Sequence, residues 1–251
     1  MGFHWLYIPL LFVVAGAYAS VGLGGGTAYL ALLSFSETDP AVLRPMAWAL
    51  NVMVTTSSVL MFRKKGHLRF SETAPYLGGG LVGAVLGASI TLGKTAFLGL
   101  LAVTLSALAV RMLFVGKSKQ EGELRKIGFV AAVVVGFCPG FLSGIVGIGG
   151  GIILGPILLA LSLMTIKKMA GVTAIYIWTT SLAALVVHFV RGGTLPWADF
   201  AIFAVVVLAG GTLGAAYGAG KADPRTLQRI FGVIVLSAAL NLGVKFVRAL
   251  F

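Results

Sequence analysis

The sequence predicts an all-α fold, a polytopic bundle of transmembrane helices. Of its 251 residues, 59% are hydrophobic and 10% are charged, and the mean hydropathy of +1.03 is far above that of soluble domains. Apolar stretches of the roughly 20 residues that one membrane crossing needs recur along almost the whole chain. Backbone groups in hydrocarbon need partners within the chain, so continuous apolar stretches of this length form helices and not barrel strands.

The apolar segments define the expected helices in order. They cover residues 4–35, 41–62, 73–93, 95–115, 127–164, 169–190, 197–219 and 226–247. The first and fifth are too long for one straight crossing, because about 32 residues of helix extend about 48 Å at 1.5 Å per residue, against a hydrocarbon core of about 30 Å. We therefore expect both to be broken or re-entrant at the glycine clusters inside them.

Three patterns occur twice along the chain and in the same order. They are Gly22-Leu23-Gly24-Gly25-Gly26 with Gly147-Ile148-Gly149-Gly150-Gly151, Met46-Ala47 with Met169-Ala170 ahead of a hydroxyl run, and Gly79, Gly80, Gly83 and Gly87 with Gly210, Gly211, Gly214 and Gly218. Such ordered matches are typical of an internal repeat. The sequence thus predicts two homologous membrane halves, residues 1–115 and 127–251, joined by a polar cytoplasmic linker at 116–126.

The net charge of +12 is explained by topology. The Lys and Arg residues lie in short loops, as the positive-inside rule expects of a membrane protein, so no nucleic-acid partner is expected. If the first and fifth segments turn back at their glycine clusters, 14 of the 19 basic residues lie on one side and 5 on the other. This distribution favours inverted halves, with both termini outside, in a multi-pass protein of the cell inner (plasma) membrane.

The two glycine clusters are candidate binding sites. Glycine is about 1 kcal/mol less favourable than Ala in a helix interior, so adjacent glycines break a helix. The free N–H groups at the start of the following half-helix then attract anions, as in broken transporter helices. The candidate residues are Gly24, Gly25, Gly26 and Thr27 in the first half and Gly149, Gly150 and Gly151 in the second. The alternative role is close helix packing, which we favour for the later, spaced glycines.

Polar side chains inside the second and sixth segments are further candidate donors to an oxyanion. They are Asn51, Thr55 and Thr56 in the first half and Tyr176, Trp178, Thr179 and Thr180 in the second. Hydroxyl groups in membrane helices also bond to their own helix or to a neighbouring one. The sequence leaves both roles open.

The acidic residues favour an anion as the substrate. All seven lie in or beside predicted loops, whereas cation pathways and proton relays usually need a carboxylate inside the membrane. Arg44, Lys167 and Lys168 are candidates for a positive charge, although such positions are more typical of interfacial anchors. No cofactor or metal is expected, since the chain has one cysteine and no ATP-binding motif.

The repeated glycine clusters resemble those of the sulfite exporter TauE/SafE family, whose members carry Gly-x-Gly-Gly-Gly near the start of each half, followed in many members by a proline. Pro156 follows the second cluster, whereas Ala31 stands at the corresponding place after the first. The resemblance covers essentially the whole chain. It implies a secondary transporter that exports sulfite, or an organosulfonate such as sulfoacetate, by alternating access.

Other functions stay open at this point. An anion channel, or an uptake permease for another small anion, would have a similar composition, and packing glycines alone would suffice for a membrane scaffold. An intramembrane serine protease built on Ser143 and His188 is a remote alternative, since the glycine spacing around Ser143 does not fit one. We therefore expect no enzyme. The expected partners are a small anion, the lipid bilayer and a second copy in a homodimer.

Overall fold

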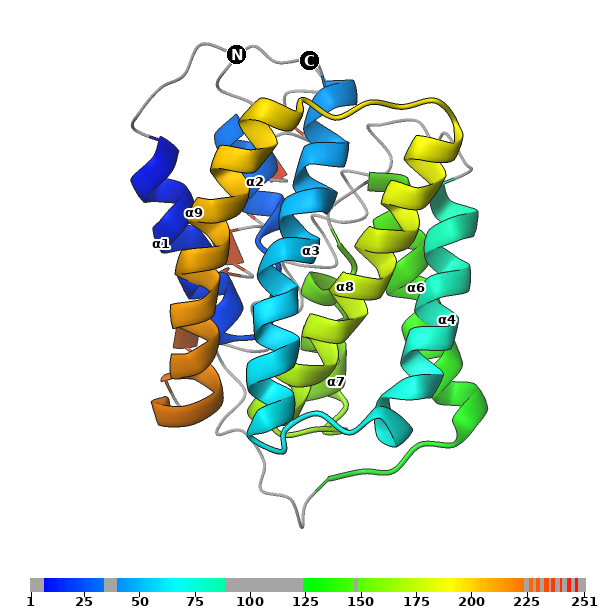
Figure 1. Ribbon diagram of the computed structural model, residues 1–251. Helices are drawn as coiled ribbons and strands as arrows, with labels where there is room; N and C mark the ends of the chain where they lie inside the picture. The colour runs from blue at the N-terminus through cyan, green and yellow to red at the C-terminus, as the bar shows by residue number, and fades with distance from the viewer. Residues whose placement is uncertain are drawn as a thin grey trace.

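The computed structural model describes residues 7–33, 40–88, 124–146 and 149–223, together with individual positions between 226 and 247. These residues form helices and contain no strand, which confirms the predicted fold class (Figure 1). The elements are α1 (Tyr7–Ser20), α2 (Gly26–Leu33), α3 (Pro40–Lys64), α4 (Phe70–Ala88), α6 (Phe129–Val146), α7 (Gly151–Ala160), α8 (Ile166–Val190), α9 (Trp197–Ala216) and the π-helix η3 (Tyr217–Lys221).

Part of the predicted organisation lies outside the described residues. This holds for the apolar segment 95–115, for positions 116–123 of the linker, and for Gly147 and Ile148. The boundary between the two halves therefore stays a prediction.

The predicted breaks in the first and fifth segments are confirmed. The first glycine turn, residues 21–25, separates α1 from α2, and the second, which includes Gly149 and Gly150, separates α6 from α7. Gly22, Gly25 and Gly149 have φ angles of +74°, +86° and +72°. Glycine populates this left-handed region freely because it has no Cβ, whereas other residues rarely do, so these glycines end one helix and redirect the chain.

The hairpin formed by α6 and α7 is re-entrant. The amide of Arg125, just before α6, donates to the carbonyl of Ser162, just after α7, at 2.8 Å. The hairpin therefore begins and ends at the same end of the molecule. In Figure 1, α1 runs toward that end and α2 runs back, so the first hairpin enters from the opposite end.

The centre of the bundle is the pair of antiparallel helices α3 and α8. Asn51 contacts Ser181, and Thr56 contacts Trp178, so the pairing advances in opposite directions along the two helices. Around this pair, α4 of the first half packs most extensively on α6 of the second, and α1 packs on α9. The two halves therefore interlock.

The spaced glycines form these outer contacts, which confirms the packing role we favoured for them. A Cβ at Gly83 of α4 would overlap the backbone of α6 at Phe137, and one at Gly214 of α9 would overlap the backbone of α1 at Gly16. Small residues let helix backbones approach in this way when hydrophobic burial does not drive association in lipid. The same packing thus recurs on both sides of the bundle.

Three helical stretches among the described residues are long and apolar enough to cross a membrane: Arg44–Lys64, Ile166–Val190 and Trp197–Lys221. The sequence predicted eight apolar segments. Two of these are divided at the glycine turns into shorter apolar helices, including Ile8–Ser20, Phe129–Ile145 and Gly151–Ala160. Each piece of a broken segment is therefore too short to cross a membrane alone.

Basic side chains gather at one end of the bundle, the lower end in Figure 1. Exposed or half-buried Lys and Arg residues lie there at the end of α3 and at the starts of α4, α6 and α8: Arg63, Lys64, Lys65, Arg69, Arg125, Lys126, Lys167 and Lys168. Arg44 and Arg191 lie toward the other end. This is the distribution that the positive-inside rule associates with a cytoplasmic face.

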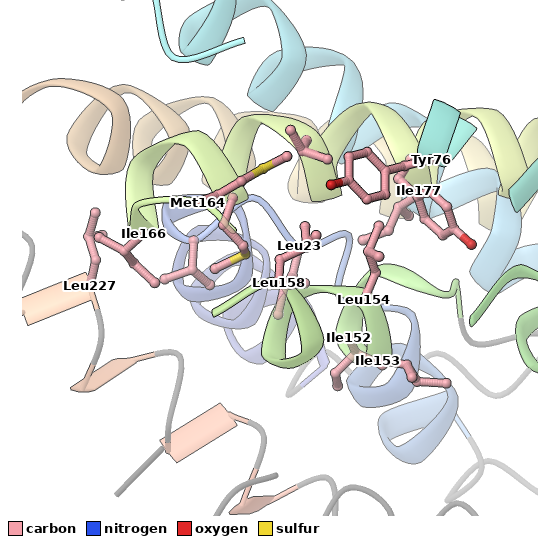
Figure 2. Close-up of a cluster of buried hydrophobic side chains, with 14 of the residues drawn as sticks. Leu23, Tyr76, Ile152, Ile153, Leu154, Leu158, Met164, Ile166, Ile177 and Leu227 are labelled. Atoms are coloured by element: carbon pink, nitrogen blue, oxygen red, sulfur yellow. The ribbon is translucent and has the colours of Figure 1, made fainter. Parts of the chain in front are cut away.

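The main apolar core joins the first glycine turn to the second half. Leu23 is buried among side chains of α7 and α8, including Leu154, Leu158 and Ile177 (Figure 2). Gly22 lies directly on the backbone of Ala170 in α8, where a Cβ would overlap it. These contacts hold the first turn against the central helix.

Candidate functional site

The two glycine turns meet at the same pair of side chains, Asn51 of α3 and Ile177 of α8. A Cβ at Gly24 would overlap Asn51 Oδ1 and lie 3.0 Å from Ile177 Cγ2. A Cβ at Gly149 would lie 3.1 Å from Asn51 Nδ2 and 3.2 Å from Ile177 Cγ2. A side chain at either glycine would crowd this pair, so residues about 125 positions apart in the sequence lie at one place in the fold.

Asn51 is the polar centre of this site. Its side chain is fully buried, and its Nδ2 donates to Ser181 Oγ at 3.4 Å. Its Oδ1 has no hydrogen-bond partner among the residues that the structure describes. A buried amide without its full set of hydrogen bonds is costly, and Nδ2 has a second hydrogen that a ligand could accept.

The N-termini of α2 and α7 begin at the two glycine turns. The first turn of an α-helix leaves its N–H groups without intrahelical partners, and the helix dipole makes that end attractive to negative charge. Gly26 and Thr27 begin α2, and Gly151 and Ile152 begin α7. Two half-helices thus bring partial positive charge to Asn51 without a charged side chain.

Tyr29 is a polar side chain at this site that sequence reasoning missed. It is fully buried, and its ring lies against Gly25, where a Cβ would lie 2.8 Å from the hydroxyl oxygen. That oxygen has no hydrogen-bond partner within the described part of the chain. Its position four residues after Gly25, one helical turn into α2, is the signal that could have revealed it.

The second glycine turn is packed by Tyr176. A Cβ at Gly150 would lie 2.6 Å from the carbonyl oxygen of Pro139 and 2.9 Å from Tyr176 Cε1. The Tyr176 hydroxyl donates to the carbonyl oxygen of Gly136 at 2.5 Å and so ties α8 to α6. The structure therefore brings Tyr176 to the turn, with its hydroxyl already engaged.

Most hydroxyl groups of the two predicted runs bond to their own helix. Thr55 donates to the carbonyl of Asn51 at 2.7 Å. Thr179 and Thr180 both donate to the carbonyl of Tyr176 at 2.9 Å. Of the two roles that the sequence left open, the structure favours the local one, since a hydroxyl has a single proton to donate.

The hydroxyl groups of two further candidates, Thr56 and Thr27, are each paired with another side chain. Thr56 is exposed and accepts a hydrogen bond from Trp178 Nε1 at 3.0 Å. The hydroxyl of Thr27 pairs with that of Tyr18 at 3.2 Å. Thr27 can therefore contribute its backbone amide to the site, while its side chain is already paired.

Charged side chains lie at the ends of the bundle. Arg44 is exposed, and Lys167 donates to the carbonyl of Gly220 in η3 at 3.3 Å. The described acids are Glu72 and Asp199, in the first turns of α4 and α9, and Asp223, which follows η3 and is exposed. No carboxylate lies at the centre within the described part of the chain, in agreement with the pattern that predicted an anion.

Comparison with known proteins assigns the chain to a family. A family model described as sulfite exporter TauE/SafE matches residues 7–242. The chain belongs to this family of membrane transporters. The match includes both glycine turns and confirms the resemblance that the repeated clusters indicated. No solved structure matches the chain.

Three curated relatives have the same general description. A probable membrane transporter protein, y4hK, of Sinorhizobium fredii is 31% identical, and the alignment covers 92% of this chain and 94% of the relative. A probable membrane transporter protein of Xylella fastidiosa is 26% identical over 93% of this chain and 95% of its own. YunE of Bacillus subtilis, described likewise, is 21% identical over 92% and 94%. These descriptions state transport and name no substrate.

Proposed function

We propose that this protein is a multi-pass secondary transporter of the cell inner membrane that exports a small sulfur-containing anion, sulfite or an organosulfonate such as sulfoacetate. The observation that carries the proposal is the fully buried Asn51, which lies between two glycine turns that each begin a half-helix. Such a site binds anions through amide groups and dipoles. The proposal of a sulfur-containing anion rests on the family and not on these residues.

Alternating access is supported by the arrangement of the helices. In Figure 1, α1, α3 and α4 each run opposite to their counterparts α6, α8 and α9. This is the relation expected of inverted repeats, in which the substrate lies at the repeat interface. Each hairpin enters from its own end, so rocking of one half against the other would expose Asn51 to each side in turn.

Efflux from liposomes tests the function. Purified protein is reconstituted with sulfur-35 sulfite inside, and release is measured with sulfoacetate, acetate, sulfate or chloride outside. We expect saturable release that sulfoacetate accelerates by exchange and chloride does not. Release that stays linear with sulfite concentration would indicate a channel, and no release of sulfite or sulfoacetate would refute the proposed substrate.

Cysteine labelling tests the topology separately. The exposed Cys138 is first replaced by Ala, and single cysteines are then introduced as Lys65→Cys, Arg125→Cys and Arg191→Cys. We expect the first two to react from the cytoplasm and the third from outside. Labelling of Lys65→Cys and Arg125→Cys from opposite sides would contradict the inverted arrangement.

A further inference from the structure

Two buried polar atoms near the first glycine turn have no hydrogen-bond partner among the described residues, namely the Tyr29 hydroxyl oxygen and Asn51 Oδ1. Both side chains are fully buried, and they come from different helices, α2 and α3. A buried polar atom without a partner is costly in a folded protein. Of the two, the Tyr29 hydroxyl can donate to an anion, whereas Asn51 Oδ1 can only accept; the donor that Asn51 offers is the second hydrogen of Nδ2, which the bond to Ser181 leaves available.

The geometry places both side chains on adjacent residues of this turn. Asn51 lies against Gly24 and Tyr29 against Gly25. The N-terminal amides of α2 follow immediately, at Gly26 and Thr27. A hydroxyl, a side-chain amide and a half-helix N-terminus therefore surround one short stretch of backbone.

The second glycine turn shares Asn51, through Gly149, but lacks a counterpart of Tyr29. Gly150 corresponds to Gly25, so the residue that corresponds to Tyr29 is Leu154. Leu154 is fully buried in the apolar core, next to Leu23 and Leu158 in the labelled cluster of Figure 2. The aromatic residue at the second turn, Tyr176, already donates its hydroxyl to Gly136.

We propose that Tyr29 and Asn51 contact the transported oxyanion directly, and that the second glycine turn contributes backbone alone. This inference rests on the proposed function and deepens it. The Tyr29 hydroxyl donates to one anion oxygen, and Asn51 donates the second hydrogen of its Nδ2, since the first goes to Ser181 Oγ. The first turn therefore adds a side-chain donor, Tyr29, that the second turn lacks, although the backbone is repeated.

The test compares Tyr29→Phe with Tyr18→Phe in the full-length protein, with sodium sulfite as the probe. Both substitutions remove one hydroxyl from a buried ring, but the Tyr18 hydroxyl is already paired with Thr27. Two quantities are measured, the unfolding temperature without sulfite and the sulfite concentration that gives half-maximal stabilisation. KM for efflux is measured alongside.

For Tyr29→Phe we expect an unfolding temperature equal to or above that of wild type, because the hydroxyl has no protein partner to lose. We expect the sulfite concentration for half-maximal stabilisation, and KM for sulfite efflux, to rise about tenfold or more, as for loss of a hydrogen bond to a charged group. Tyr18→Phe lowers the unfolding temperature and leaves the sulfite dependence unchanged.

Two results overturn the inference in different ways. Tyr29→Phe with wild-type sulfite dependence, in a protein that transports sulfite, refutes the role of Tyr29 and leaves the transport function standing. Wild-type protein that neither transports sulfite nor is stabilised by it refutes the proposed function, and the inference with it.

Discussion

The two glycine turns have similar backbones and different surroundings. At the first, unpartnered atoms of Tyr29 and Asn51 lie against Gly25 and Gly24. At the second, Gly149 also lies against Asn51, but Gly150 is covered by the ring of Tyr176 and by the carbonyl of Pro139. The repeat therefore supplies two half-helix N-termini, and the side chains decide what each one can bind. If the proposed site is correct, a repeated framework binds its substrate with a side-chain donor that only the first turn supplies.

The largest expected effect is at the second turn. Gly150→Val should abolish sulfite efflux, because its side chain would enter the space of Pro139 and Tyr176. Valine can adopt the φ angle of −65° that Gly150 has, so the loss would come from steric overlap and not from backbone strain. Gly78→Val is the matched control, since a Cβ there meets no atom within 4 Å. Full efflux by Gly150→Val, at equal amounts in the membrane, would contradict a role for this turn.

Asn51→Asp tests the sign of the charge that the site accepts. A carboxylate between two half-helix N-termini should repel an anion, so we expect sulfite affinity to fall by more than the roughly tenfold loss expected of Asn51→Leu. Affinity is measured from the concentration dependence of efflux. An Asn51→Asp protein that keeps its sulfite affinity, or that gains cation transport, would show that the site does not bind an anion.

Larger side chains at the α4–α6 and α1–α9 contacts should destabilise the protein equally, whereas substitutions at the two glycine turns should differ in effect. Gly83→Leu at the contact of α4 with α6, and Gly214→Leu at that of α9 with α1, both place a side chain against a neighbouring backbone. Overpacking of this kind costs about 1–3 kcal/mol, measured by reversible unfolding in mixed detergent. Gly78→Leu again serves as the control. A neutral effect at only one of the two positions would show that the outer contacts are not equivalent.

The smallest expected effect is at a hydrogen bond between α3 and α9 that has no counterpart at the corresponding position of α8. Ser57 of α3 and Thr212 of α9 share a hydrogen bond of 2.9 Å, whereas Thr180, the counterpart of Ser57, bonds within its own helix. A double-mutant cycle with Ser57→Ala and Thr212→Val should give a coupling of about 0.6 kcal/mol, the average for such bonds in membranes. Zero coupling would remove this difference between the halves.

The sequence was sufficient to predict the helical class and the broken segments, and it selected Asn51, which the structure places against both glycine turns. Three adjacent glycines disfavour a helix whatever surrounds them, so the breaks just before Gly26 and Gly151 are a local property. Asn51 was identified because a side-chain amide in a membrane helix is conspicuous. Both features depend on residue type and on spacing along one segment.

The rest depends on contacts between segments. In the sequence, Tyr29 is indistinguishable from the apolar residues of a membrane helix, and only the fold shows that it lies against Gly25. Conversely, the sequence allows Thr55 and Thr180 to donate to a ligand, whereas the structure shows that their hydroxyls donate hydrogen bonds to carbonyls of their own helices. The exposure of Thr56, and its bond to Trp178, follow only from how α3 crosses α8. Sequence alone cannot tell a hydroxyl that is free from one that is engaged.

The most direct test of the central claim is to locate the bound anion. Crystals of the protein grown with selenite, a heavier analogue of sulfite, would give an anomalous signal at the selenium atom. We predict one peak beside Asn51, between Gly24 and Gly149 and within hydrogen-bonding distance of the Tyr29 hydroxyl. A peak confined to the basic end of the bundle, with none beside Asn51, would contradict the account.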